Sequence, residues 1–377
     1  MSTIVDKQLL EILRSALWGT PVTVLNGFDD WNGLFAAAKK QSVLGLVANV
    51  VLNDSSVSSL IPNDMKAKIK AFTMTNVATH NLVNNTLLKV VDVLEQAGIP
   101  FVLLKGQAMA RNYPLPELRA CGDIDMYVGQ ENYLRACELL SGIATWKEEG
   151  DPSENKEKHF DVKIGEVIVE VHRFTDIIPS ERYNKIYQAY SDEGLSVNTR
   201  NVNFAGTIVQ TPADDFNAFY VFNHIWHHFM NGGVGLRQMC DWMLFLHARK
   251  DDIDREKLRK IIEDMNLMKP WQTFGCVLVD VLGLPQEEFP FYSVRRKKYA
   301  PKILKYILAE GNFGHDNEVF KRRAGDRYLK RKFKSMYLQS KRTMPLVFIF
   351  PSHFSGPYCK TMFSGVWRVC KDLVRVK

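Results

Sequence analysis

The chain contains 377 residues, of which 46% are hydrophobic and 24% are charged, so it can bury a sizeable core and lacks the composition of a disordered protein. Its six cysteines are scattered without a C-x-x-C pair, which argues against a disulfide scaffold and a zinc ribbon. The net charge of +7 is uneven, because residues 294–377 hold 21 Lys and Arg against 5 Asp and Glu, while the rest holds 28 against 37.

The first ninety residues are predicted to be helical. Helices are expected at Leu9–Leu17, Trp31–Ala37, Gly45–Leu52, from Asp64 to beyond Met74, and at Asn81–Ala97. Gly98 and Pro100 then form a stop signal. Charged residues lie within the first helical pattern, so no secretory signal is expected. The longest apolar runs are too short to cross a bilayer, and a cytoplasmic protein is the expectation.

A small α/β core is predicted next. Its expected strands are Ile99–Leu104, Asp123–Val128 and a hairpin of His159–Ile164 with Val167–Arg173, and its expected helices are Gln107–Asn112 and Glu131–Ser141. This order of elements predicts a mixed sheet with helices on one side.

The remainder of the chain is predicted to be helical again. Expected helices cover Asp214–Phe229, Leu236–His247, Asp254–Met265 and Trp271–Val281, followed by two basic helices at Arg295–Ala309 and Val319–Ser340. Glycine and prolines at 283–290 mark a boundary. We therefore expect an N-terminal helical segment (1–85), the α/β core (86–210), a helical domain (211–290) and a basic helical segment (291–377).

Three carboxylates in neighbouring strands form the most informative pattern. In the run Asp123–Ile124–Asp125, the alternation of side chains along a strand puts both aspartates on one face. Glu170 alternates with valines in a second strand, so it lies opposite to the apolar face. Carboxylate oxygens and substrate phosphates are the ligands that Mg²⁺ prefers, and two such ions can assist phosphoryl transfer.

Each part of this pattern has a simple structural alternative. A D-x-D run is common in strands, and a glutamate among valines usually belongs to a solvated face. Here the charged residues lie in segments apolar enough to be buried, where unpaired charges are costly, and they follow a strand–Lys–Gly–helix element at Leu104–Gly106. The combination favours a metal site.

Several runs together carry a family resemblance. They are Leu103–Gly106, Tyr113–Pro114, Arg119, Asp123–Asp125, Val169–His172 and, after a histidine-bearing helix, Gly235–Trp242. Over roughly residues 85–285 the chain resembles the bacterial uncharacterised nucleotidyltransferase family of the polymerase-beta superfamily. The resemblance implies a metal-dependent enzyme that moves an NMP group from a nucleoside triphosphate to an acceptor hydroxyl or phosphate and releases pyrophosphate.

The resemblance also implies roles for individual residues. Asp123 and Asp125 would bind two Mg²⁺ ions, or Mn²⁺ in their place, and Glu170 would be the third metal ligand and the base. Lys105 and the amide of Gly106 would contact the triphosphate at a helix N-terminus, which attracts anions.

Arg119 would neutralise phosphate or hold the aspartate loop. One departure is Gln107, at a position where many members of the superfamily have a serine whose hydroxyl contacts phosphate. Lys105 can supply charge there instead. His172 is either an orienting partner beside Glu170 or a buried core histidine.

Two further groups come from the helical region. Arg237 and Asp241, four residues apart, form either an intrahelical ion pair or, by the family resemblance, part of the cleft. His224, His227 and His228 share a helical face and can bind zinc, although the interleaved aromatic residues favour packing or contact with the acceptor.

The basic C-terminal stretch from Lys321 to Arg342 has interleaved aromatic residues and suits RNA, an anionic membrane surface or solvent. A non-catalytic RNA- or partner-binding protein on the same core, or a toxin-like enzyme that modifies tRNA, are therefore alternatives. The acceptor, whether small molecule, RNA or protein, cannot be read from the sequence.

Overall fold

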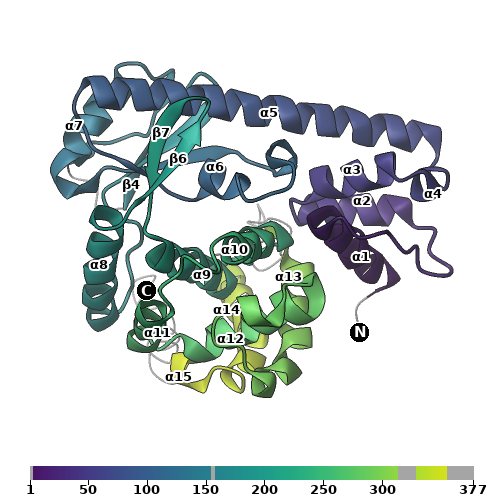
Figure 1. Ribbon diagram of the computed structural model, residues 1–377. Coiled ribbons are helices and arrows are strands. Elements are labelled where there is room, and N and C mark those ends of the chain that lie inside the picture. The colour runs from purple at the N-terminus through teal and green to yellow at the C-terminus, as the bar shows by residue number, and fades with distance from the viewer. Residues whose placement is uncertain (1–2, 154–157, 313–327, 355–377) are drawn as a thin grey trace.

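Five helices precede the first strand. The computed structural model describes residues 3–153, 158–312 and 328–354. In Figure 1 the first four helices gather at one end of the long fifth one; their bounds are α1 (Ile4–Trp18), α2 (Trp31–Lys40), α3 (Leu44–Asn53), α4 (Ser55–Ser58) and α5 (Asn63–Gln96). The helix α1 begins at a capping box on Thr3 and ends at Gly19, whose left-handed backbone stops it.

The two helices predicted over 64–97 are one continuous helix, α5. Its middle is exposed on most sides, so the apolar period disappears there, but it contains neither glycine nor proline to interrupt the backbone. Its C-terminal half buries Leu87, Val90 and Leu94. That half packs against the sheet.

The sheet confirms the predicted mixed α/β core. Its five strands lie in the order β1-β2-β5-β4-β3, in which only β2 and β5 are parallel. Their bounds are β1 (Val102–Leu103), β2 (Asp123–Tyr127), β3 (Trp146–Lys147), β4 (His159–Ile164) and β5 (Val167–His172). The predicted strand at 99–104 is thus reduced to two residues, and β3, which is exposed, was not predicted.

The two faces of the sheet differ in chemistry. Ile124 and Met126 of β2, the valines of β5 and the apolar residues of β4 are buried. This face is covered by α5 and α7 (Gly129–Ser141). The polar residues of the same strands therefore point to the opposite face. Figure 1 shows α9 and α10 on that side of the core.

Residues 174–211, for which no element is predicted above, form α8 (Glu181–Ser196) and a hairpin of β6 (Arg200–Phe204) and β7 (Thr207–Thr211). The hairpin pairs its strands in a separate two-stranded sheet. Its residues alternate between exposed and more buried positions. The exposed positions include the apolar Ile208 and the buried ones include the polar Thr211, so the sequence pattern of period two is faint.

The C-terminal helices are α9 (Asp214–Asn231), α10 (Leu236–Ala248), α11 (Arg255–Asp264), α12 (Met268–Val277), α13 (Ala300–Glu310), α14 (Tyr328–Val347) and α15 (Pro351–Phe354). Those predicted at 214–229, 236–247 and 254–265 are confirmed. Part of the expected basic helix, 319–327, lies outside the described residues, and α14 continues beyond its predicted end at Ser340. Among the described residues, no helix combines the length and the apolar character needed to cross a bilayer.

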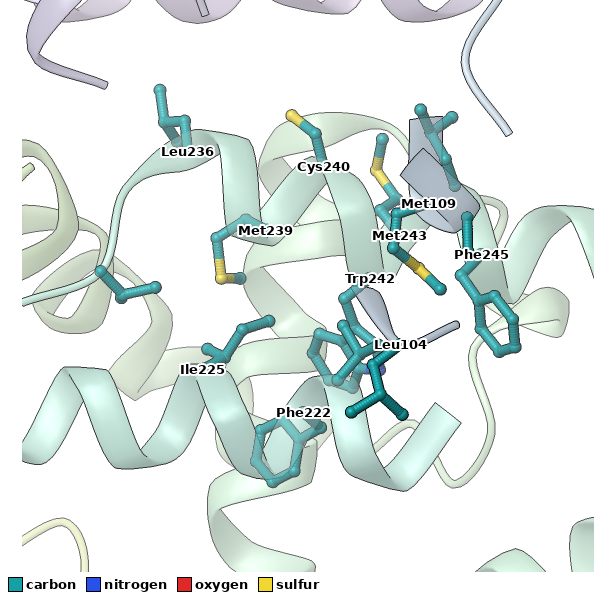
Figure 2. Packing of buried hydrophobic residues seen from close by; sticks show 14 of the residues in the cluster. Leu104, Met109, Phe222, Ile225, Leu236, Met239, Cys240, Trp242, Met243 and Phe245 are labelled. Atoms are coloured by element: carbon teal, nitrogen blue, oxygen red, sulfur yellow. The ribbon is translucent and has the colours of Figure 1, made fainter. Parts of the chain in front are cut away.

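One apolar cluster links the helical region to the core. Figure 2 shows Phe222 and Ile225 of α9 and Trp242 and Met243 of α10 in the same buried group as Leu104 and Met109, which flank the strand-to-helix turn. This packing fixes the turn relative to α9 and α10, so the polar residues beside it have a defined place.

Candidate functional site

Carboxylates form a row across the polar face of the sheet. Asp125 of β2 is the register partner of Glu170 in β5, and Asp161 of β4 is the partner of Glu170 on its other side. Paired side chains lie on the same face, and Asp123, two residues before Asp125, shares it. The predicted trio of Asp123, Asp125 and Glu170 therefore shares the polar face of the sheet.

Asp161 is a fourth carboxylate that was not predicted. The signal was present in the sequence, because Phe160, Val162 and Ile164 alternate with it and are buried on the apolar face. The neighbouring Asp161 and Glu170 carry like charges. Burial, followed by the Glu170 charge, raises the pKa of Asp161 to about 6.

Two nitrogen-bearing side chains contact Asp125. The ammonium of Lys105 lies 3.1 Å from Asp125 Oδ1, and His172 Nε2 lies 3.1 Å from the same oxygen. His172 Nε2 is also 3.0 Å from Glu170 Oε2, and its Nδ1 is 3.2 Å from the carbonyl of Phe174. His172 is fully buried and also contacts Glu170. It is therefore both a buried histidine and a partner of Glu170, the two alternatives that the sequence left open.

These contacts set the charges of the site. Burial alone would raise the pKa of Asp125, but Lys105 and His172 outweigh it and hold the pKa well below its ordinary value. Burial lowers the pKa of His172, but the hydrogen bonds to Asp125 and Glu170 outweigh it and the pKa is raised. Asp123 differs, because burial and the nearby Asp125 raise its pKa.

His159, which was not predicted as a site residue, completes this cluster. It lies opposite His172 in the ladder between β4 and β5, with ring centroids 4.9 Å apart. Its Nδ1 is 3.5 Å from Glu170 Oε2 and its Nε2 is 3.5 Å from Asp161 Oδ1. The signal in the sequence was its alternation with the buried Phe160, which puts His159 on the same face as Asp161.

The Lys105–Gly106 turn lies where β1 meets α6 (Lys105–Ala110). Gly106 has φ 43° and ψ −115°, so the six-residue helix is interrupted at its second residue and is not the regular N-terminus that was expected. This backbone is strained for any residue with a side chain. Gln107 is buried and donates to Asn84 of α5, so it points away from the carboxylates.

A cavity of about 230 Å³ opens in front of the carboxylates. Its walls come from the sheet, the Lys105–Gly106 turn, α9 and α10. Asp123, Asp125 and Glu170 line one side, and Lys158 and Arg237 bring positive charge to it. A cavity with both kinds of charge can hold cations beside phosphate groups.

Arg119, Arg237 and Asp241 all line this cavity. The expected intrahelical pair of Arg237 with Asp241 is wrong, because Asp241 receives two hydrogen bonds from Arg119. Arg237 instead donates to the carbonyl of Ala120 at 3.0 Å. Arg119 and Arg237 thus both hold the loop before β2.

The three helical histidines separate. His224 and His228 line the cavity, with ring centroids 4.3 Å apart, and burial lowers the pKa of both. His227 turns toward Asp176, 3.7 Å away. In the described part of the chain, the group that gathers three metal-ligating side chains is His159, Glu170 and His172, so the structure does not favour zinc on the three helical histidines.

Comparison with known proteins gives one family. The model of the family described as "Uncharacterised nucleotidyltransferase" matches residues 28–283. No curated protein matches the chain. Among solved structures, the crystal structure of an antigenic nucleotidyltransferase-like protein from Paracoccidioides brasiliensis matches with 12% identity and a TM-score of 0.30, covering 54% of this chain and 92% of that one.

Proposed function

Because the chain belongs to the uncharacterised nucleotidyltransferase family, we propose that it is a metal-dependent enzyme that transfers a nucleoside monophosphate group. The donor is a nucleoside triphosphate, the acceptor is a hydroxyl or phosphate of a second substrate, and pyrophosphate is released. The observation that carries the proposal is that Asp123, Asp125 and Glu170 all line one cavity, which Lys105 also lines.

The donor set fits divalent cations. Besides the carboxylate row, two buried atoms of the cluster, Asp161 Oδ1 and His159 Nδ1, have no hydrogen-bond partner among the described residues. Asp123, Asp125 and Glu170 would hold the ions, Mg²⁺ or Mn²⁺. When bound, such ions supply positive charge that stabilises the attacking and leaving oxygens.

The chain's own residues would supply the remaining steps. Lys105 places an ammonium at the carboxylates, where it attracts the phosphates of the donor. Glu170, held by His172, accepts the proton of the acceptor hydroxyl. The hydroxyl oxygen then forms a bond to the α-phosphorus as the bond to the bridging oxygen breaks, and pyrophosphate leaves with that electron pair.

Label transfer tests the proposal without knowledge of the acceptor. Each of the four triphosphates, labelled at the α-phosphate, is incubated with the protein, Mg²⁺ and cell extract, and the extract is fractionated into small molecules, lipid, RNA and protein. We expect one fraction to gain label with the native protein and none to gain it with Asp125→Asn. Equal labelling by Asp125→Asn would overturn the assignment.

The outcome also separates the alternatives. Label in the tRNA fraction, with growth arrest that Asp125→Asn relieves, identifies a tRNA-modifying transferase. A non-catalytic binding protein gives no label in any fraction. Thermal stabilisation by triphosphate and Mg²⁺, repeated with Glu170→Ala, then shows whether the cavity binds the donor at all.

A further inference from the structure

We propose that His159, Glu170 and His172 form a binding site for a first-row transition-metal ion, Mn²⁺ or Zn²⁺, in preference to Mg²⁺. The inference rests on the proposed function, because it names the class of metal that Glu170 binds. Its test measures metal binding alone and does not depend on catalysis. One ligand atom from each of the three side chains lies within 4.8 Å of the other two. The adjacent strands β4 and β5 supply all three residues.

The hydrogen bonds of His172 orient it as a ligand. The carbonyl of Phe174 can only accept, so the contact at 3.2 Å places a hydrogen on Nδ1 of His172. Metal-binding histidines commonly donate their second N–H to a backbone carbonyl in this way. Nε2 then faces Asp125 and Glu170 at 3.1 Å and 3.0 Å, and a metal ion that binds Nε2 would replace the proton that Nε2 shares with the two carboxylates.

His159 brings the second nitrogen. Its Nδ1 is buried, has no hydrogen-bond partner among the described residues and lies 3.5 Å from Glu170 Oε2. A buried polar atom without a partner costs about 1–3 kcal/mol, and a bound cation would supply that partner. The second nitrogen of the ring lies 3.5 Å from Asp161, which places a carboxylate behind the ligand, as metal-bound histidines often have.

The donor chemistry selects the class of metal. Mg²⁺ prefers oxygen ligands in a rigid octahedron, whereas imidazole nitrogen suits zinc, copper, iron and nickel. Manganese also binds a nitrogen–oxygen set, although more weakly than zinc does. The Asp123 and Asp125 side chains offer oxygen alone. The sheet therefore offers two chemically different metal positions. One has only the oxygen ligands of Asp123 and Asp125, and the other combines the Glu170 carboxylate with the two histidine nitrogens. Two nitrogen ligands of one tetrahedral zinc ion lie about 3.4 Å apart, so ligand atoms that lie within 4.8 Å of one another would close by about an ångström or more on binding.

Pulsed electron paramagnetic resonance of bound Mn²⁺ tests the site directly, because it detects nitrogen nuclei attached to the ion. The full chain is treated with chelator and titrated with Mn²⁺, without triphosphate or acceptor. We expect a nitrogen signal that His159→Gln and His172→Gln weaken or abolish, together with at least about tenfold weaker Mn²⁺ and Zn²⁺ binding by calorimetry. His227→Gln is the matched control and should leave both readouts unchanged.

The proposal fails if bound Mn²⁺ shows no nitrogen signal, or if His159→Gln binds Mn²⁺ and Zn²⁺ as tightly as the native chain. It also fails if Mg²⁺ displaces Mn²⁺ at equal concentration. His159 is 21% exposed at its side chain, so His159→Gln is expected to fold even where the fully buried His172→Gln does not. A nitrogen signal without label transfer would leave this site in place and overturn only the proposed function.

Discussion

Arg119 and Asp241 form a buried, two-pronged ion pair between the core and α10. Arg119 Nε lies 2.7 Å from one oxygen of Asp241, and Nη2 lies 2.8 Å from the other. The hydroxyl of Tyr113 donates to the same carboxylate at 2.7 Å. Because two nitrogens of the Arg119 guanidinium donate to Asp241, Arg119 holds the loop before β2 against α10, which forms a wall of the cavity.

Removing either partner should destabilise the protein strongly. Arg119→Ala leaves an uncompensated buried carboxylate, and Asp241→Ala leaves an uncompensated guanidinium, so each is expected to cost about 3–5 kcal/mol in urea unfolding. The double variant should cost less than the sum. Lys185→Ala, which breaks the exposed pair with Glu181, is the control and should cost less than about 1 kcal/mol. Equal losses for Arg119→Ala and Lys185→Ala would contradict the prediction.

Gly106→Ala should damage the site. The backbone at Gly106, with φ 43° and ψ −115°, is open to glycine but strained for alanine, and a new Cβ would lie 3.4 Å from the carbonyl of Asp123. We expect a loss of about 1–3 kcal/mol and weaker triphosphate binding, because Lys105 precedes the turn. Gly122→Ala, beside Asp123 but with open space and an ordinary φ, is the control. Thermal unfolding and triphosphate titration measure both, and similar behaviour of the two variants would rule out strain as the cause.

The core was predictable because its signals are local. The strands β2, β4 and β5 each show alternation with a buried apolar face, so the side on which Asp125 and Glu170 lie follows from the sequence. The register that pairs them does not, since it depends on the order of strands in the sheet. For the same reason Asp161 and His159 become site residues only when β4 lies beside β5.

The sequence also could not predict which charged residues form ion pairs with one another. The spacing of Arg237 and Asp241 suits a helical pair, yet Arg119, more than a hundred residues away, takes the carboxylate. Local spacing shows which residues are able to meet, and the competition is decided by tertiary packing. The helix α5 illustrates the converse, because its exposed middle lacks the apolar period by which helices are recognised.

Asp161→Asn should stabilise the metal-free protein in a pH-dependent way. The pKa of Asp161 is about 6 in the folded protein, against 3.8 ordinarily, so the folded state binds this proton more tightly than the unfolded state. The ionised carboxylate therefore costs stability above pH 6, and the cost vanishes below about pH 4. After a discount for solvent at this half-buried group, we expect a gain of about 1 kcal/mol at pH 7.5 for Asp161→Asn.

Thermal unfolding of chelator-treated protein at pH 4 and pH 7.5 measures this difference. Asp151→Asn, at an exposed carboxylate whose pKa is lowered by hydrogen bonds to Ser153, is the control and should give no gain at either pH. An equal gain from Asp161→Asn at both pH values would show that removing charge is not the cause.

Arg237 is expected to contribute more to triphosphate binding than to the stability of the fold. Its Nε is buried without a partner among the described residues, and burial, followed by the like charge of Arg119, lowers its pKa. An apolar residue of similar length in its place removes the cost of burying the charge but also the hydrogen bond to the Ala120 carbonyl, so the free energy of unfolding should fall by less than it does for Arg119→Met. A phosphate of the donor would supply the missing partner, at about 1.5–3 kcal/mol for a charged hydrogen bond. Arg237→Met should thus bind triphosphate at least about tenfold more weakly in the presence of Mg²⁺, as measured by calorimetry.

Arg119→Met is the comparison for stability. It should unfold at a lower urea concentration, because it leaves the buried Asp241 without its ion-pair partner. If Arg237→Met loses as much stability as Arg119→Met, Arg237 is a structural cation and the phosphate role passes to Lys105 and Lys158.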